Sequence, residues 1–264
     1  MIKRTVRERP ILFSGEMVRA TLDGRKTQTR RVMKRNLPFQ NEHGDWEWYP
    51  AGKATGFHAT SGQPVFDVPQ GWAHDWCPFG GHGERLWVRE TFVLENCEAP
   101  LPDRPHRTEP GEWGNYLVPH YRATEPEPHI VPLDLSDSYD DRTRWTPSIF
   151  MPRWASRITL EIVDVRVERV QDITKKDAIK EGIQWSEAFP EGYTVGASLD
   201  PSGMMVGGSY KFHAYSATQC FAKLWDSLNA TRGYGWDVNP WVWVVEFRQI
   251  QPGQQRLPEQ KGEG

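Results

Sequence analysis

The sequence predicts an α+β protein in which β-strands carry flanking helices and long irregular insertions. Three observations predict this class. Several segments alternate apolar and polar residues, as strands do. Other segments repeat apolar residues every three or four positions after a capping residue, as helices do. Three long stretches rich in Gly, Pro and charged residues show little period.

The composition indicates a protein of the cytoplasm that folds without crosslinks. At 264 residues the chain can bury a substantial core. Its three cysteines form no C-x-x-C pair, which argues against a disulfide framework and against a zinc ribbon. No run of about 18 apolar residues occurs, so we expect neither a signal peptide nor a membrane span. The net charge of −3 argues against a nonspecific binder of duplex nucleic acid.

The first predicted helix opens after Ser14 and ends at Gly24. Ser14 can accept a backbone hydrogen bond as an N-cap, and Gly24 tolerates the left-handed dihedral angles of a helix end. A basic segment follows, in which six of the eleven residues from 25 to 35 are Lys or Arg. Such a run is usually a solvated face, but beside a pocket it attracts phosphate or a nucleic-acid strand.

Lys26 and Thr29 lie three residues apart in this basic segment. On a regular strand their side chains would face opposite sides, so cooperation between the amine and the hydroxyl requires a turn or a bulge. A purely structural interpretation is also open. Arg25 and Lys26 can complement the negative end of the helix dipole, and the threonines of this segment can begin a strand.

Four segments lack the periodicity of a core element. We interpret the stretches at about 36–81, 96–144 and 185–215 as insertions, because long loops in compact domains usually serve a site or a partner. The tail at 251–264 is polar and rich in Gly and Pro, and we expect it to be disordered. The remainder of 9–250 is predicted to be a single domain.

At the end of the first insertion and just after it, His74, Cys77 and His82 are close enough in sequence to suggest a metal site. Their spacing matches no strong zinc pattern. We therefore expect no metal, with a buried cysteine beside ordinary loop histidines instead.

Three segments are predicted to be core strands. Residues 83–92 alternate between an apolar face and a cationic face. Residues 157–170 indicate a long strand that bends, as strands of a barrel do. Residues 241–247 are apolar on both faces, which is typical of a central strand. Within the second insertion, residues 116–118 and 120–122 are predicted to pair as two short strands.

Two more helices are marked by capping boxes. Thr174 with Asp177 opens the first of them, and Gly182 ends it. Glu181 then lies in the last turn, where its negative charge meets the negative end of the helix dipole at a cost of about a few tenths of a kcal/mol. An unfavourably placed charge of this kind indicates either a functional site or a solvated side chain. Ser216 opens the second helix, whose apolar residues recur at helical spacing.

The segment Trp145–Arg157, with its aromatics, two prolines and two arginines, is the most specific motif of the chain. Together with the Gly-Arg-Lys-Thr-x-Thr that starts at Gly24 and the helix ending at Glu181, it resembles the ASCH family, a branch of the PUA-like small β-barrels. More narrowly, residues 9–250 look like the large ASCH-containing proteins of tailed phages and prophages. The resemblance implies a small PUA-like mixed β-barrel as the core.

A small bacterial member of this family is an N4-acetylcytidine amidohydrolase. Its catalytic Lys-x-x-Thr corresponds to Lys26 and Thr29 here, and its catalytic glutamate to Glu181. The resemblance therefore implies a modified nucleoside as ligand and no cofactor. From the chemistry of these three groups, our hypothesis is that Thr29 attacks the amide carbonyl, that Lys26 takes the threonine proton, and that Glu181 protonates the leaving amine and later helps to position water.

Two other functions remain open at this level. One is a binding module for RNA or DNA, in which the cleft holds a nucleobase or a single strand without transforming it and basic residues contact phosphate. The residues predicted for those contacts are Arg25, Arg30, Arg31, Arg89, Arg153 and Arg157. The other is a virion-assembly or host-interaction protein in which the barrel serves as a scaffold.

Overall fold

The structure is a computed structural model that describes residues 6–34, 37–40, 46–49, 77–97, 105–108, 116–126, 144–186, 192–195, 212–214 and 216–250. Outside these residues lie the predicted tail and most of each predicted insertion, at 251–264, 36–81, 96–144 and 185–215. His74 of the candidate metal motif also lies outside them.

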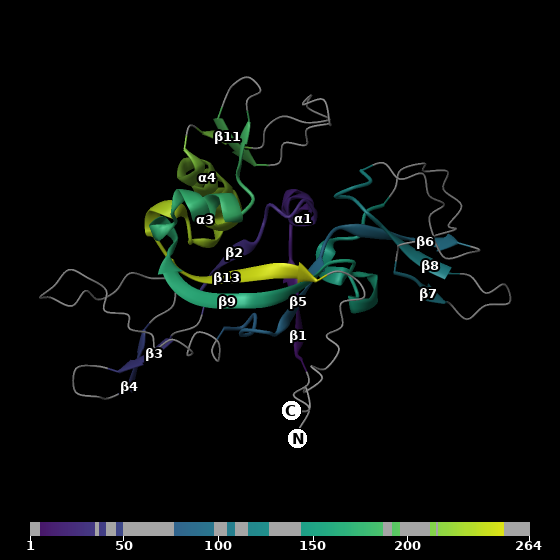
Figure 1. Ribbon diagram of the computed structural model, residues 1–264, viewed down its shortest axis with the longest axis horizontal. Helices are drawn as coiled ribbons and strands as arrows, with labels where there is room; N and C mark the ends of the chain where they lie inside the picture. The colour runs from purple at the N-terminus through teal and green to yellow at the C-terminus, as the bar shows by residue number, and fades with distance from the viewer. Residues whose placement is uncertain are drawn as a thin grey trace, which may run out of the picture.

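A mixed five-stranded sheet forms the centre of the molecule (Figure 1). Its order is β1-β5-β9-β13-β2. β1 and β5 pair in parallel, and the other neighbours are antiparallel. The strands span Glu8–Leu12 (β1), Arg85–Arg89 (β5), Thr159–Arg169 (β9), Trp241–Ile250 (β13) and Gln28–Val32 (β2). The predicted α+β class and the central position of the last strand are confirmed.

The sheet is not a closed barrel: its edge strands β1 and β2 form no backbone ladder with each other in the part of the chain that the structure describes. A side chain bridges them instead, because Arg31 of β2 donates a hydrogen bond of 2.6 Å to the carbonyl oxygen of Leu12 in β1. The backbones of the two edges are thus held apart by a guanidinium group. A seam between the edge strands remains, and this seam positions the candidate site.

β9 and β13 form the longest ladder of the sheet and give it its curvature (Figure 1). Glu246 pairs with Asp164 and Phe247 with Ile162, so Val163 has no opposite residue and forms a bulge. The predicted bent strand is therefore one continuous strand. Alternate side chains of β13 pack into two different clusters: Val242 and Val244 face one side, while Trp241, Trp243, Val245 and Phe247 face the other. This two-sided burial explains the unbroken apolar run.

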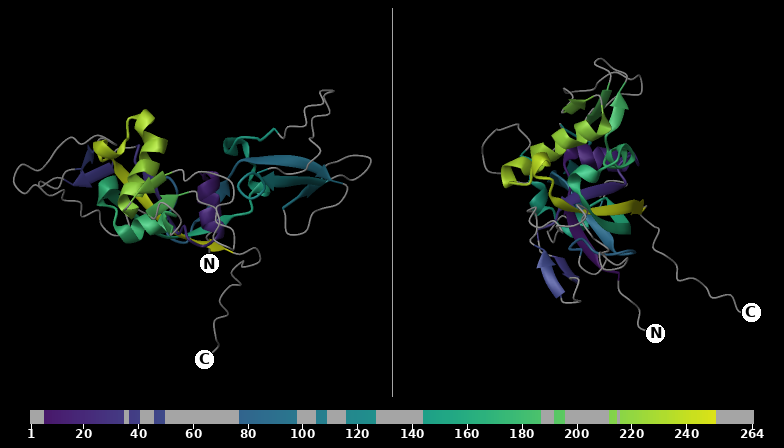
Figure 2. Two further views of the ribbon diagram at one scale, coloured as in Figure 1. Left: turned by 90° about the horizontal axis from the view of Figure 1, so that it is seen from above. Right: turned by 90° about the vertical axis from the view of Figure 1, so that its left-hand side faces the viewer.

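Three helices lie against this sheet: α1 (Gly15–Leu22), α3 (Lys175–Lys180) and α4 (Ala217–Asn229). Each begins where the sequence predicts, because the hydroxyl of its N-cap accepts a hydrogen bond from the backbone N–H three residues later. These N-caps are Ser14, Thr174 and Ser216. α3 and α4 lie side by side and pack with Val242 and Val244 on one side of β13 (Figure 2).

The smaller elements form separate sheets and short 3-10 turns. One three-stranded sheet, ordered β6-β8-β7, projects away from α3 and α4 (Figure 2). Its strands are Phe92–Cys97 (β6), Tyr116–Tyr121 (β8) and Arg107–Thr108 (β7). The prediction of two short strands pairing with each other at 116–118 and 120–122 is wrong. Pro119 stays in the ladder opposite Leu94, so the segment is one strand that pairs with β6.

The other small elements border the site or the insertions. They are β3 (Leu37–Gln40), β4 (Trp46–Tyr49), β10 (Gln184–Ser186), β11 (Gly192–Val195), β12 (Phe212–Ala214), η1 (Ser148–Phe150), η2 (Arg153–Ala155), η3 (Val170–Asp172), η4 (Ala230–Arg232) and η5 (Trp236–Val238).

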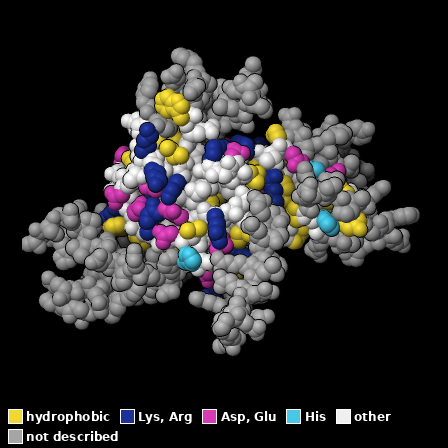
Figure 3. All heavy atoms as spheres, viewed as in Figure 1, with side chains coloured by type: hydrophobic (Ala, Val, Ile, Leu, Met, Phe, Trp, Pro, Cys, Tyr) yellow, Lys and Arg dark blue, Asp and Glu magenta, His cyan; other side chains and the backbone are white. Residues whose placement is uncertain are grey.

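On the face around α3 and β9, basic and acidic side chains are interspersed (Figure 3). The ion pairs there join Arg166 to Glu168 and to Glu246, and Lys180 to Glu246.

Candidate functional site

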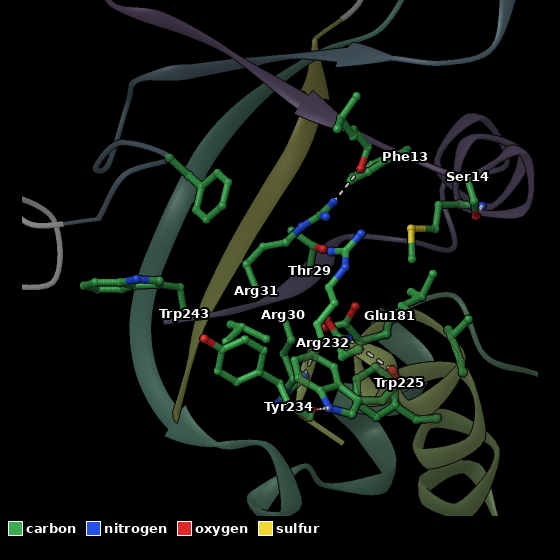
Figure 4. Close-up of a pocket in the computed structure, with 18 of the residues that line it drawn as sticks. Phe13, Ser14, Thr29, Arg30, Arg31, Glu181, Trp225, Arg232, Tyr234 and Trp243 are labelled. Carbon is green, nitrogen blue, oxygen red and sulfur yellow. Dashed lines mark hydrogen bonds and ion pairs between the residues drawn. The ribbon is translucent and has the colours of Figure 1, made fainter. Parts of the chain in front are cut away.

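A cavity of about 1170 Å³ lies at the seam between β1 and β2. Most of its wall comes from the end of β1 with the start of α1, strand β2, helix α4 and the turn that follows α4 (Figure 4). Further lining residues are Pro78, Phe79, Thr91, Ser148, Glu181 and Trp243. Thr29, Arg30, Arg31 and Glu181 all line it. The seam thus gathers four of the nine sequence-predicted site residues around one space.

Lys26 and Glu181 form a buried ion pair behind the cavity wall. Lys26 Nζ donates to Glu181 Oε2 at 2.9 Å, and the two side chains are 0 % and 4 % exposed. The same amine donates to the carbonyl oxygens of Gln28 at 2.8 Å and Glu181 at 3.0 Å, so all three of its protons have acceptors. Burial lowers the pKa of Lys26, and the adjacent Glu181 carboxylate opposes that shift.

Close backbone packing brings Glu181 to Lys26. Gly182, which follows Glu181, has a φ of +100° and ends helix α3. A Cβ atom at Gly182 would lie 3.1 Å from Ala20 Cβ, so glycine allows this end of α3 to approach α1. Just after Lys26, the N–H of Thr27 donates to the carbonyl oxygen of Lys180 at 2.9 Å. These contacts fix the carboxylate beside the amine.

Arg30 holds the other oxygen of Glu181. Its guanidinium donates to Glu181 Oε1 at 3.2 Å and to Glu168 Oε2 at 2.9 Å, and Asp177 lies 3.8 Å away. Two cations therefore surround the Glu181 carboxylate, which explains how a negative charge is tolerated at the negative end of α3. Since three carboxylates surround Arg30, its charge is balanced within the protein.

Thr29 lies on the opposite face of β2 from Arg30. It pairs with Val245 in the ladder and is 2 % exposed, yet its side chain contributes to the cavity wall. Lys26 lies in the turn before β2, as cooperation between the two residues requires. Among the described residues, however, the Lys26 amine donates its hydrogen bonds to Gln28 and Glu181 and none to Thr29.

Arg31 and Arg232 extend from opposite walls toward each other beside Thr29 (Figure 4). Arg31 comes from β2, packs over the Phe13 ring at 5.8 Å and has no hydrogen-bond partner for its Nε atom. Arg232 comes from η4, the turn after α4. Burial lowers the pKa of Arg31 to about 10, with Glu181 raising it and Arg232 lowering it, so the guanidinium is still a cation at neutral pH.

Aromatic rings form much of the remaining wall. The indole N–H of Trp225 in α4 donates to the carbonyl oxygen of Tyr234 at 2.8 Å, which ties the helix to the turn after it. The rings that line the cavity belong to Phe13, Phe79, Phe221, Trp225, Tyr234 and Trp243. Flat apolar rings of this kind can stack on a nucleobase.

The remaining predicted arginines lie outside the cavity lining. Arg25 pairs with Asp23 at 2.7 Å and reaches the carbonyl oxygen of Gly182. Arg89 and Arg153 both lie over the Trp87 ring, at 4.6 and 5.8 Å.

Arg157 is likewise engaged within the fold. It makes two hydrogen bonds of 2.9 Å to the carboxylate of Glu90 and lies over the Tyr121 ring at 4.0 Å. The structure thus brings together Arg30, Arg31 and the three candidate catalytic residues, and leaves Arg25, Arg89, Arg153 and Arg157 at other positions.

Sequence reasoning missed several residues of the site. Arg232 and Tyr234 lie in turns that have no periodicity, so no pattern marks them. Trp225 was expected in the core of α4, and it is 3 % exposed, but its buried ring also faces the cavity. Glu168 is one of several charged residues on β9, so the sequence does not single it out.

Comparison of the chain with protein-family models, with curated proteins and with solved structures found no match. Within the described residues, no group of three or more His, Cys, Asp or Glu side chains is arranged to hold a metal ion. None of the helices there is long and apolar enough to cross a membrane.

Proposed function

We propose that the chain is a nucleobase-binding protein of the ASCH type and that its cavity hydrolyses the amide bond of an N4-acylated cytidine. The observation that carries this proposal is the 2.9 Å pair of Lys26 and Glu181, because its carboxylate residue lines the same cavity as Thr29. The proposal includes the PUA-like fold, as a barrel that stays open along one seam. The curvature of β9 and β13 and the Arg31 bridge across the seam support it.

The pair can supply a base and an acid by moving one proton. Transfer from Lys26 Nζ to Glu181 Oε2 along their hydrogen bond gives a neutral amine and a carboxylic acid without any change in total charge. Burial favours this neutral form, since it lowers the pKa of the amine. Arg30 opposes it, because its hydrogen bond to Oε1 favours the carboxylate.

In the first half-reaction, the Thr29 hydroxyl oxygen bonds to the amide carbonyl carbon and its proton passes to the neutral Lys26 amine. The carbon–nitrogen bond then breaks, and Glu181 gives its proton to the leaving amine, which produces cytidine. The acyl group remains on Thr29 as an ester. Lys26 is now an ammonium and Glu181 a carboxylate.

In the second half-reaction, a water molecule attacks the ester carbon. Glu181 takes a proton from that water, the bond to Thr29 breaks, and Lys26 returns a proton to the threonine oxygen. The carboxylic acid product leaves, and the pair has regained its neutral form. Each group thus ends in the state in which it began.

The cavity also has the features that a nucleobase needs. Its aromatic rings offer flat surfaces, and the outer edge of β2 offers backbone groups. Thr27 accepts from the N–H of Phe247, and Met33 donates to Trp241, so the odd-numbered residues between them face β13. The N–H and C=O groups of Arg30 and Val32 therefore face away from β13, and no described strand pairs with that edge, so a ligand could use them.

A nucleoside screen tests this function. The purified protein is incubated with N4-acetylcytidine, other acylated nucleosides and unmodified nucleosides, and the products are identified by mass spectrometry. We expect cytidine from N4-acetylcytidine with the wild-type protein, and a rate about 10²- to 10⁴-fold lower with Glu181→Gln, which lacks the acid. Equal rates with both proteins would overturn the proposed roles.

A second candidate is a binding module that holds a modified nucleoside or a single strand without turnover. One observation favours it: the three acceptors around Lys26 satisfy the ammonium form completely, as in a purely structural ion pair. In that case the screen would give no product. Ligand affinity would then be retained in Glu181→Gln, provided that the variant is folded.

A further inference from the structure

We propose that Arg31 and Arg232 form a phosphate subsite, so that the cavity takes a nucleotide in preference to a free nucleoside. This inference rests on the proposed nucleobase-binding function and names its substrate class. The phosphate is that of a mononucleotide or of a nucleic-acid strand, and the experiment below separates these two sources.

Among the described residues, the two arginines lack an acidic partner that would balance their charge. Among the described residues, neither Arg31 nor Arg232 has a carboxylate within ion-pair distance. One hydrogen bond of Arg31 goes to the neutral carbonyl oxygen of Leu12, and its buried Nε atom has no partner. Two guanidinium groups therefore reach one space with donors to spare.

The cations around Glu181 differ from these two arginines, because carboxylates already pair with them. Glu181 is already held by Lys26 at 2.9 Å and by Arg30 at 3.2 Å, and Arg30 has two further carboxylates near it. Glu181 is also the one carboxylate in the described lining, which contains Arg30, Arg31, Lys34 and Arg232. The positive charge that no carboxylate balances is thus concentrated on Arg31, Arg232 and Lys34.

The guanidinium groups of Arg31 and Arg232 also repel each other. The charge of Arg232 lowers the pKa of Arg31, so the two cations destabilise each other in the absence of an anion. A phosphate between them removes this repulsion and can accept paired hydrogen bonds from each planar guanidinium. A cavity of about 1170 Å³ also exceeds what a nucleoside alone requires.

The position beside Thr29 allows one alternative use of the same arginines. They could stabilise the oxyanion that forms when Thr29 attacks the amide carbonyl. That role would affect the rate of every substrate to the same extent. A phosphate subsite instead changes the affinity of phosphorylated ligands alone, and this difference makes the inference testable.

The test is isothermal titration calorimetry at low salt with cytidine, cytidine 5′-monophosphate, a short cytidine oligonucleotide and inorganic phosphate as probes. The proteins are the wild type, Arg232→Gln and Arg248→Gln. The last is a matched control, because Arg248 is an exposed arginine paired with Glu161 on the main sheet and lies outside the cavity lining. We expect the monophosphate to bind about 10- to 100-fold more tightly than cytidine to the wild type.

Arg232→Gln should remove this preference and leave the affinity for cytidine within about twofold, whereas Arg248→Gln should keep it. Tighter binding of the oligonucleotide than of the monophosphate would identify a strand as the source of the phosphate. Inorganic phosphate should bind to the wild type and not to Arg232→Gln, whatever base the cavity prefers.

Two results would overturn the phosphate subsite while leaving the proposed function intact: equal affinities for cytidine and its monophosphate, or a deacylation rate that Arg232→Gln lowers equally for nucleoside and nucleotide. If inorganic phosphate binds but no nucleoside or nucleotide does, the subsite stands as an anion site and the proposed function fails. If no probe binds, both fail.

Discussion

The Nζ atom of Lys26 lies 2.9 Å from Oε2 of Glu181, although 155 residues separate them in the chain. One residue precedes an edge strand and the other ends a helix, and the two side chains are almost completely enclosed. The pair therefore links the stability of the fold to the chemistry of the cavity. Substitutions at this pair should therefore change both the stability of the protein and its activity.

Removing one partner of this pair should be strongly destabilising. Lys26→Met leaves the buried Glu181 carboxylate with Arg30 as its remaining cation, and we expect a loss of about 3 kcal/mol in the free energy of unfolding. Urea denaturation measures this loss. The double variant Lys26→Met with Glu181→Gln should recover part of it, because the buried charge is then absent. A double variant that loses the full sum of the two single effects would show that the residues are not coupled.

Substitution of Arg30 should mainly affect stability, and substitution of Arg31 should mainly affect binding. Arg30→Gln removes the cation shared by Glu168 and Glu181, so we expect a loss of about 2–4 kcal/mol in stability. Arg31→Gln removes a hydrogen bond to the Leu12 carbonyl oxygen, worth about 1–2 kcal/mol, and should mainly weaken the binding of cytidine 5′-monophosphate. Thermal unfolding and calorimetric titration of both variants separate the effects. If Arg30→Gln left stability unchanged, the buried network would have no structural role.

Gly182 should not tolerate a side chain. At its φ of +100° an alanine is strained, and its Cβ would lie 3.1 Å from Ala20 Cβ. We expect Gly182→Ala to destabilise the protein by about 1–3 kcal/mol and to lower deacylation, because Glu181 is displaced from Lys26. Gly233→Ala is the matched comparison, since its φ is +81° with open space around it. Equal effects of the two substitutions on activity would rule out a role for the close approach of α1 and α3.

Two buried thiols should make the protein less stable at alkaline pH. Burial raises the pKa of Cys77 and that of Cys220 from 9.0 to about 11. Between these two pKa values the unfolded chain binds fewer protons than the folded one, so the free energy of unfolding falls as pH rises. The total loss is about 2 kcal/mol for each thiol. Below pH 9.0 both states keep the proton and this effect vanishes.

Urea denaturation from about pH 8 to about pH 11 measures this dependence. The variant with Cys77→Ala and Cys220→Ala controls for the other groups that titrate in the same range. If that variant lost stability with the same slope as the wild type, the thiols would not be the cause.

Much of the framework was predictable from the sequence because it depends on local pattern. The caps at Ser14, Thr174 and Ser216 are short-range signals, and the alternation in β9 and the apolar run in β13 report directly on burial. The unfavourable position of Glu181 was also visible, and the structure supplies its reason in two nearby cations.

The geometry of the site was not predictable in the same way. The seam between β1 and β2 results from the curvature of the whole sheet, which no local pattern records. Arg232 reaches the cavity only because α4 packs against the sheet and the turn after it folds back. The carboxylate partners of Arg30 come from β9 and from α3 with its C-terminal end, far along the chain. Its basic neighbours in the sequence therefore suggested a cation without acidic partners, whereas carboxylates balance its charge in the structure.

The most direct measurement is the rate of cytidine release from N4-acetylcytidine by the wild type, Thr29→Ala, Thr29→Ser and Arg248→Gln, each shown to be folded by its thermal transition. We predict turnover by the wild type and by Arg248→Gln, partial turnover by Thr29→Ser, and a loss of about 10³-fold or more in Thr29→Ala. Full activity in Thr29→Ala, or no turnover by a folded wild type, would contradict hydrolysis at this site.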